Sequence, residues 1–216
     1  MKILALEFSS EQRSAAALDT TMPKRLGLAS EAGGRTTRAF HLIEQALHQA
    51  GLEREQIDTV AIGLGPGSYT GIRVAISVAQ GWQLARGIRL LGISSVEGLA
   101  AKALAAGLVG QVTIAVDAQR NEFYVAIYEL ASANPRPIEP LRLVSVDELR
   151  SRSTSDIIAG PEVGQLIPTA RTLFPDAAAL AQLAATRTDF VTGEELEPIY
   201  LRETAFVKAP QPPKRP

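Results

Sequence analysis

The chain has 216 residues, of which 46% are hydrophobic and 21% charged, a composition that is typical of a folded globular protein and excludes a disordered chain. Its net charge of −1 gives no basic surface field, which argues against independent binding to nucleic acid. The absence of cysteine excludes disulfide bonds, thiolate nucleophiles and zinc–cysteine sites. Residues 3–6 form an apolar run that Glu7 interrupts, too short for a signal or membrane segment, so we expect a cytoplasmic protein with no membrane contact.

The first half of the chain alternates apolar runs with turn residues. The predicted strands cover residues 2–8, 14–19, 25–30, 59–64 and 89–93, and the predicted helices cover residues 36–50, 71–86 and a segment that ends near residue 106. Gly51 follows the first helix at the position where a glycine commonly ends one. Ser94 and Glu97 have the spacing of a capping box ahead of the last helix.

The second half continues the same alternation. Its predicted strands cover residues 111–117, 122–129 and 156–159, and its predicted helices follow Ser145 and cover residues 177–186. Residues 131–140 contain prolines and are predicted to form a loop. The tail from residue 197 onward has four prolines after Val207 and is expected on the surface. The whole pattern predicts an α/β fold.

A glycine-rich turn connects the strand over residues 59–64 to the helix over residues 71–86. Its members are Gly65, Pro66, Gly67, Ser68, Tyr69, Thr70, Gly71 and Arg73. Ser68 and Thr70 are placed to cap the helix, and a helix N-terminus with glycines can also hold an anion. The spacing is neither a Walker loop nor a dinucleotide fingerprint, so a tight turn of small residues is favoured over an anion site.

The helix over residues 71–86 is apolar on two sides. One stripe contains Ile72, Ala75, Ile76 and Ala79, and the other contains Val74, Val78, Trp82 and Ala85. A helix of this kind is buried on two sides, by the sheet and by a second helix from the same chain or from a partner. With the helix over residues 36–50 it predicts a partner interface that contains Phe40, Ile43, Leu47, Val74, Val78 and Trp82.

The two halves begin with the same unit. Residues 4–8 and 114–118 both read apolar, alanine, apolar, acid, and each leads through a polar turn into a second strand, with a constant offset of 110 positions. We interpret this as a duplicated fold with two lobes, residues 1–106 and 107–216, that face a cleft. Glu7 and Asp117 would then point into the cleft, where acids hold a metal–phosphate group in nucleotide-binding proteins.

Several motifs occur in one order along nearly the whole chain. They are residues 4–7, the turn at 65–73, Gln80-Gly81, residues 116–120 with Asp117 and Arg120, and residues 197–202. Together they resemble the TsaB (YeaZ) family of the sugar kinase/Hsp70/actin superfamily, and the Gly-Pro-Gly-Ser-Tyr-Thr-Gly element at residues 65–71 is the most specific part. The resemblance implies two lobes of RNase-H-like topology.

The resemblance also implies a role in making threonylcarbamoyladenosine next to the anticodon, at position 37, of tRNAs that read codons starting with A. In that family the protein is a non-catalytic accessory subunit that pairs with the catalytic subunit TsaD, and the ATPase TsaE joins the assembly. ATP and metal are expected on the partner subunits, with no firmly bound cofactor on this chain. The same surface can support a homodimer, and tRNA is contacted only through the complex.

The histidines agree with a non-catalytic role. His41 and His48 lie seven positions apart, roughly 10 Å along a helix, so they cannot share one metal ion directly. We therefore expect no metal site and no peptidase chemistry. The sequence departs from the family pattern at Glu7, where aspartate is usual, and at Arg35, where histidine is typical. The longer arm of Glu7 would displace a metal–phosphate group, so the three residues Glu7, Asp117 and Arg120 are predicted to line at most a vestigial nucleotide cleft.

Two alternatives remain open at this point. One is a self-sufficient ATP-dependent kinase or hydrolase with Glu7 and Asp117 as metal-facing acids, although the sequence shows no obvious general base and no run of phosphate-binding lysines. The other is a plain dimeric scaffold that is unrelated to tRNA.

Overall fold

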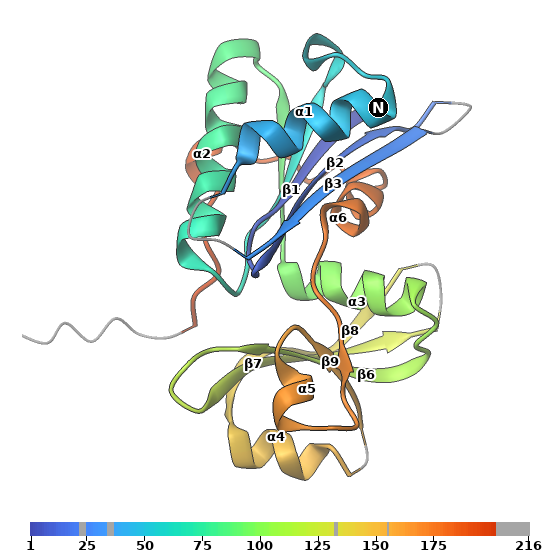
Figure 1. Cartoon of the computed structure of the whole chain (residues 1–216), viewed down its shortest axis with the longest axis vertical. Coiled ribbons are helices and arrows are strands. Elements are labelled where there is room, and N and C mark those ends of the chain that lie inside the picture. Colours follow the sequence, from blue (N-terminus) through green and yellow to red (C-terminus); the bar gives the residue numbers. More distant parts are fainter. Residues whose placement is uncertain (22–24, 34–36, 132–133, 155, 202–216) are drawn as a thin grey trace, which may run out of the picture.

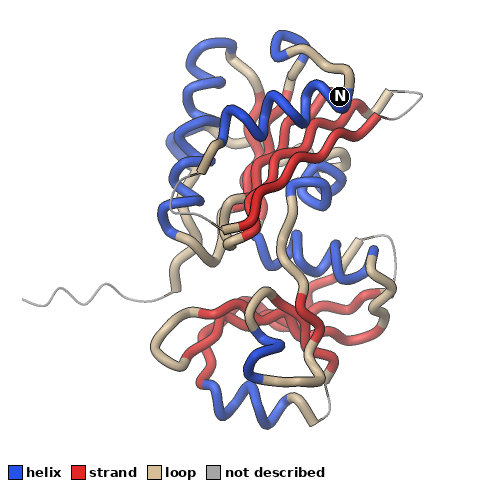
Figure 2. Tube along the Cα trace, in the orientation of Figure 1, coloured by secondary structure: helices blue, strands red, loops and turns tan. Residues whose placement is uncertain are grey.

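Two lobes, each built on a mixed sheet, make up the computed structural model (Figures 1 and 2), which describes residues 1–21, 25–33, 37–131, 134–154 and 156–201. The first sheet has the order β3-β2-β1-β4-β5. Its strands are β1 (Lys2–Glu7), β2 (Gln12–Asp19), β3 (Arg25–Ala32), β4 (Thr59–Gly63) and β5 (Arg89–Ile93). The first three strands are antiparallel, whereas β4 and β5 run parallel to β1.

The second sheet repeats this topology. Its order is β10-β9-β6-β7-β8, which matches the first sheet when it is followed from the opposite edge. Its strands are β6 (Gly110–Asp117), β7 (Glu122–Leu130), β8 (Arg136–Ser145), β9 (Ile157–Gly160) and β10 (Arg171–Thr172). Again three antiparallel strands are followed by two parallel ones. The predicted duplicated α/β fold is therefore confirmed.

Two of the helices pack on the sheet of the other lobe from the strand that they follow. Helices α1 (Ala39–Ala50) and α2 (Tyr69–Arg86) pack on one face of the first sheet, and α4 (Val146–Arg152) and α5 (Val163–Leu166) belong to the second lobe. Helix α3 (Ser95–Ala105) follows β5 but packs on the second sheet, while α6 (Ala177–Ala184) follows β10 but packs on the first (Figure 1). The division into residues 1–106 and 107–216 stays a prediction, and these two helices make contacts across it.

Ion pairs connect α3 to both ends of α6. Lys102 on α3 lies 2.8 Å from Asp176, which caps α6 by accepting a hydrogen bond from the Ala179 N–H. Arg187, just after α6, lies 3.1 Å from Glu97 on α3. Helices α3 and α6 therefore bind each other as well as the two sheets, so they join the lobes.

The chain after α6 continues along the first lobe. Val191 forms an isolated bridge with Leu90, and the short turn η2 (Gly193–Glu195) leads to the buried Leu196. The Ile199 N–H then donates to the Leu64 carbonyl over 2.8 Å. Residues 197–201 lie along the surface of the first lobe, exposed or half-buried as expected, and residues 202–216 lie outside the described part.

The loop predicted over residues 131–140 is wrong for its second half. Strand β8 occupies Arg136–Ser145 and includes Pro137 and Pro140. Among the described strands it pairs with β7 alone, and its register shifts between Val125 and Tyr128. An edge strand tolerates proline because one side of its backbone needs no partner, so proline was a poor signal of a loop here.

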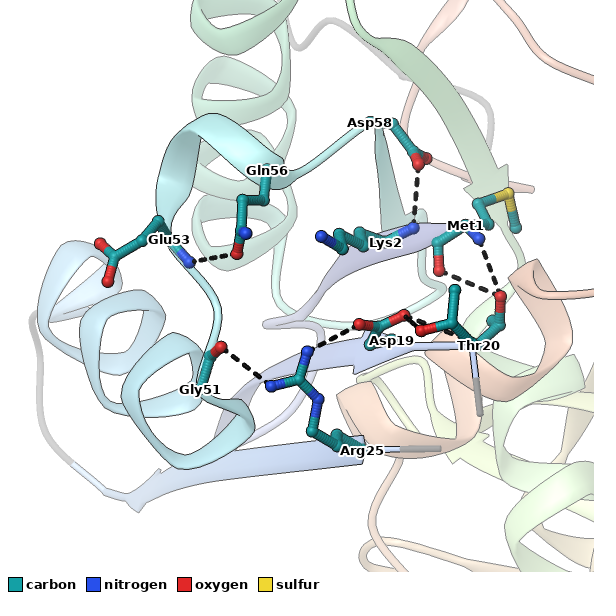
Figure 3. A network of polar contacts seen from close by, with 10 residues as sticks. Met1, Lys2, Asp19, Thr20, Arg25, Gly51, Glu53, Gln56 and Asp58 are labelled. Atoms are coloured by element: carbon teal, nitrogen blue, oxygen red, sulfur yellow. Dashed lines mark hydrogen bonds and ion pairs between the residues drawn. The ribbon is translucent and has the colours of Figure 1, made fainter. Parts of the chain in front are cut away.

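A polar network fixes the outer edge of the first sheet (Figure 3). The Asp19 side chain is buried and accepts hydrogen bonds from the Thr21 backbone, the Thr21 hydroxyl and Arg25. These donors hold the pKa of Asp19 well below its usual range. Arg25 also donates to the Gly51 carbonyl at the end of α1. The network therefore ties β2, β3 and α1 together at the end of the lobe that lies away from α3.

Candidate functional site

Helix α2 is defined by its two caps and by one buried face. The Ser68 hydroxyl accepts from the Gly71 N–H at the N-terminus, and Gly87 ends the helix in the left-handed conformation. The face that contacts the sheet consists of Gly71, Ile72, Ala75, Ile76 and Ala79. This is the first of the two apolar stripes in the sequence, and it leaves the second stripe facing outward.

The outward stripe of α2 forms one wall of a groove of about 640 Å³. The groove residues are Phe40, Tyr69, Thr70, Arg73, Val74, Ser77, Val78, Gly81 and Trp82. Phe40 comes from α1 and is 62% exposed, although it is a large apolar side chain. Four residues of the predicted partner interface, Phe40, Val74, Val78 and Trp82, therefore lie together in one hollow. We call this hollow the α2 groove.

The prediction is wrong for two residues of the interface. Ile43 is 1% exposed and Leu47 is 4% exposed, and both belong to the core beneath α1. They lie on the stripe with Leu42 and Ala46, which α1 needs to cover β2 and β3. A side chain that fills the core of its own lobe has no surface to offer a partner.

Gly81 is an unusual residue in the α2 groove. It lies inside a regular helix, and a β-carbon added there would meet no atom within 4 Å. Glycine in a helix interior destabilises the folded state by roughly 0.5–1 kcal/mol relative to alanine. No contact among the described residues requires glycine at this position, so the lack of a side chain leaves an open depression in the exposed face.

The glycine-rich turn is a place of close backbone approach. A β-carbon at Gly67 would lie 2.1 Å from the Ser9 carbonyl oxygen, and one at Gly71 would lie 2.0 Å from the Phe8 carbonyl oxygen. The Ser68 N–H donates to the same Ser9 carbonyl over 2.6 Å. The glycines therefore allow the turn to pack on the chain that follows β1, which sets where α2 begins. The contacts support the interpretation as a tight turn.

Glu7 does not lie in the cleft, contrary to the prediction. Its side chain is fully buried and accepts hydrogen bonds from the Ser9 N–H and the Ser95 hydroxyl, each over 2.8 Å. It lies against Gly63, where an added β-carbon would be 2.1 Å from Glu7 Oε2. Burial raises the pKa of Glu7 above its ordinary value, although the bonds from Ser9 and Ser95 act in the opposite direction.

The cleft between the lobes has a volume of about 1140 Å³. Asp117 and Arg120 line it, and Asp117 accepts from the backbone and side chain of Gln119. Arg120 is the middle one of three successive non-glycine residues with positive φ, at 65°, 58° and 61°. Such a left-handed turn is unfavourable for residues with a β-carbon. This turn holds the Arg120 backbone at the cleft wall. The role of Arg120 in a vestigial nucleotide site stays a prediction.

Two cleft residues were missed by sequence reasoning. Among the described residues, the buried side-chain polar atoms without a partner are Nε and Nη1 of Arg13 and Oε2 of Glu162. Both residues line the cleft, Arg13 from the first lobe and Glu162 from the second. Burial and the nearby Asp117 and Glu11 raise the pKa of Glu162. Neither residue stands out in the sequence, because their proximity depends on how the lobes meet.

The arrangement does not fit a metal–phosphate group at the first-strand acid. Both carboxylate oxygens of Glu7 are occupied by internal donors, and the side chain is closed off from the cleft. Within the described part of the chain, no group of three or more histidines and acids could hold a metal ion. His41 and His48 are both exposed on α1. Arg35 lies outside the described residues.

A cluster of aromatic rings joins the two hollows, and it too was missed. Tyr69 lines both the cleft and the α2 groove. Its ring centroid is 5.2 Å from that of Tyr200, and the Arg73 guanidinium lies over it at 4.7 Å while donating to its hydroxyl. Burial raises the pKa of Tyr200 to about 12. The sequence placed Tyr200 in a separate motif, 131 positions from Tyr69.

None of the helices in the described part of the chain has the length and the apolar character needed to cross a bilayer.

Comparison with known proteins gives consistent results. A family model described as TsaD, tRNA N6-adenosine threonylcarbamoyltransferase, matches residues 35–189. The chain is 27% identical to the tRNA threonylcarbamoyladenosine biosynthesis protein TsaB of Escherichia coli, with 97% of this chain and 99% of that protein covered. It is 32% identical to TsaB of Haemophilus influenzae, over 57% of this chain and about half (52%) of that protein. The structure of YeaZ from Pseudomonas aeruginosa superimposes with a TM-score of 0.81 at 27% identity, with 93% and 99% of the two chains covered.

Proposed function

Because the chain belongs to the TsaD family and, within it, to the TsaB (YeaZ) group, it has a role in tRNA threonylcarbamoyladenosine biosynthesis, and we propose that this role is that of a non-catalytic accessory subunit. It pairs with a TsaD-like catalytic subunit and activates the transfer of the threonylcarbamoyl group to the adenosine at position 37 of tRNA. The α2 groove is the observation that carries the proposal, since it is a large apolar surface that nothing in the described chain covers.

The shape of the α2 groove favours a helix of the partner. Val74, Val78 and Trp82 recur at the spacing of one helix face, which is how helices present apolar side chains to each other. Gly81 leaves room for the backbone of a second helix to approach closely. Phe40 from α1 bounds the other side of the groove, so two helices of this chain would meet two helices of the partner.

The assignment as a non-catalytic subunit rests on the chemistry of the side chains. Glu7 is the acid that an ATP-dependent kinase or hydrolase would need in the cleft, and it is buried and hydrogen-bonded elsewhere. The exposed histidines of α1 are too far apart to share a metal ion. These observations weigh against a self-sufficient enzyme, and we assign ATP and metal to the partner subunits.

The remaining partners follow from the same assignment. A TsaE-like ATPase joins the pair, tRNA is contacted through the complex, and the assembly works in the cytoplasm. Two copies of this chain compete with the catalytic subunit for the α2 groove, because an apolar surface that accepts a related helix can also accept its own. Asp117 and Arg120 face the cleft and are proposed to be remnants of a nucleotide site.

A matched pair of substitutions on one helix tests the proposal. Val78→Asp places a charge in the α2 groove, whereas Leu84→Asp places the same charge at a residue that is 91% exposed on α2 and does not line the groove. In co-purification with the catalytic homologue of the same organism, V78D is expected to lose the complex and L84D to retain it. Retention of the complex by V78D, with a folded protein, would contradict the interface.

A further inference from the structure

Hydrogen bonds join Gly65, Ser95 and Glu7 into one buried chain. The Gly65 N–H donates to Ser95 Oγ over 3.1 Å, and the Ser95 hydroxyl donates to Glu7 Oε2 over 2.8 Å. A serine hydroxyl carries a single proton, so Ser95 serves both neighbours only by accepting from Gly65 and donating to Glu7. Glu7 is therefore the acceptor that fixes the direction of this chain of bonds.

Further backbone bonds connect Glu7 to the start of α2. The Ser95 N–H donates to the Gly65 carbonyl over 2.8 Å, so Ser95 holds Gly65 by two bonds. On the other side, Glu7 Oε1 accepts from the Ser9 N–H, and the Ser9 carbonyl accepts from the N–H of Ser68, the N-cap of α2. Glu7 thus supports both Gly65, which opens the glycine-rich turn, and Ser68, which caps α2.

Within the described residues, the other polar side-chain bonds that tie α2 to the rest of the chain lie in its C-terminal half. The Gln80 amide donates to the Gly193 carbonyl and the Gly193 N–H donates to Gln83, each over 2.8 Å. Arg86 donates to the Arg54 carbonyl over 2.6 Å. The N-terminal half of α2, which supplies Tyr69 and Val74 to the groove, has its polar support at Glu7.

Ser95 also connects this support to the second lobe. It is the first residue of α3, and the following residues Val96, Leu99 and Ala103 pack on the second sheet. Ser95 itself is fully buried. A shift of α3 with the second lobe would therefore reach Gly65, and through it the first turn of α2.

We propose that Glu7 is a positioning residue for the α2 groove: through Ser95 and Gly65 it fixes the N-terminal half of α2 relative to α1, and so holds the groove in the shape that the partner binds. The proposal rests on the assignment of the groove to the catalytic partner. It gives the buried acid a role in assembly and not in chemistry. A preformed groove binds more tightly because less ordering is needed on association.

The test compares two buried serines. Ser95→Ala removes the hydroxyl between Gly65 and Glu7. Ser14→Ala removes a hydroxyl that is also buried but whose hydrogen bond, accepted from the Ala177 N–H, leads to the start of α6 and not to α2. Hydrogen–deuterium exchange of the free full-length chain is measured first, followed by the affinity for the catalytic homologue. Glu7→Gln keeps the shape and the acceptor for Ser9, and its amide N–H can donate to Ser95 Oγ in place of the bond that Ser95 donates, so it serves as the conservative variant.

We expect S95A to raise exchange over residues 65–74 and to weaken partner binding about tenfold, the effect of one lost buried hydrogen bond. S14A should raise exchange near residue 177 and leave the affinity within about twofold, and E7Q should stay within about threefold of the wild type. Equal effects of S95A and S14A on both measurements, or an unchanged exchange pattern in S95A, would overturn the proposal. If the wild-type chain does not bind the catalytic homologue, the proposed function fails, while the exchange pattern still decides the role of Glu7.

Discussion

The α2 groove and the interlobe cleft are two hollows of one molecule with opposite character. The groove is the smaller, at about 640 Å³ against 1140 Å³, and its walls are mainly apolar. The cleft contains Arg13, Asp117, Arg120 and Glu162, so both signs of charge face it. In a duplicated fold the cleft between the lobes is the expected place for catalysis. The Glu7 side chain, however, is buried in the core and does not line the cleft. The comparison supports the proposal that this chain acts through the α2 groove on its outer surface.

The largest expected effect is a loss of partner affinity that distinguishes the α2 groove from the cleft. Trp82→Ala in the groove should weaken binding to the catalytic homologue by about 30- to 100-fold, because buried tryptophans carry about 2–3 kcal/mol of interface energy. Arg120→Ala in the cleft should leave the affinity within about twofold. Both affinities can be measured by calorimetry. A larger loss from R120A than from W82A would reverse the comparison.

A second substitution tests whether the Glu7 side chain lies in the core over Gly63 and not in the cleft. Gly63→Ala should lower the free energy of unfolding by about 2 kcal/mol, because its methyl group would overlap the Glu7 carboxylate. The double variant with Glu7→Ala should lose less than the sum of the two single variants, since the methyl group then fills the vacated space. Chemical denaturation measures all three values. Simple additivity would show that Glu7 does not lie over Gly63.

The pH dependence of stability provides a third test. Glu7 has a raised pKa in the folded state, so its contribution is fully present below its ordinary value of 4.5 and is lost as pH rises through the folded pKa. Wild type should therefore lose stability relative to E7Q as pH rises from about 4.5. Asp19 has a lowered pKa, so wild type should lose stability relative to D19N as pH falls below 3.8. Thermal melting of the wild type and the two variants across pH checks both predictions. If the stability differences for E7Q and D19N changed in the same direction with pH, the opposite pKa shifts of Glu7 and Asp19 would be contradicted.

The smallest expected effect concerns Gly81. Gly81→Ala should raise the stability of the free chain by about 0.5–1 kcal/mol, because alanine is the better helix former and the site is open. The same methyl group should weaken pairing, since it occupies the depression that a partner backbone would approach. Thermal melting and calorimetry on one preparation measure both. A variant that is more stable and pairs normally would show that no helix crosses α2 at this point.

Sequence reasoning was accurate where local spacing decides the structure. The helical repeat of Val74, Val78 and Trp82 placed them on one face of the helix, and all three line the groove. The equal offset of residues 4–8 and 114–118 gave the duplication. The same reasoning failed for Ile43 and Leu47, because periodicity identifies an apolar face but does not say whether a sheet already covers it.

The position of the Glu7 side chain depends on residues that are distant in the sequence. Its position at the end of β1 follows from the sequence, but its side chain is held by Gly63 and Ser95, which lie 56 and 88 positions away. Arg13 and Glu162 were missed for the same reason, since only the meeting of the two lobes brings them to one cleft. Long-range packing, which no local pattern encodes, decides where such side chains point.

The most direct measurement is threonylcarbamoyl transfer to tRNA by the catalytic homologue of the same organism, with and without this chain and with V78D in its place. The account predicts that transfer requires the wild-type chain, that V78D does not support it, and that the chain alone hydrolyses no ATP. Full transfer without this chain, or full activity with V78D, would contradict the claim that it acts through the α2 groove.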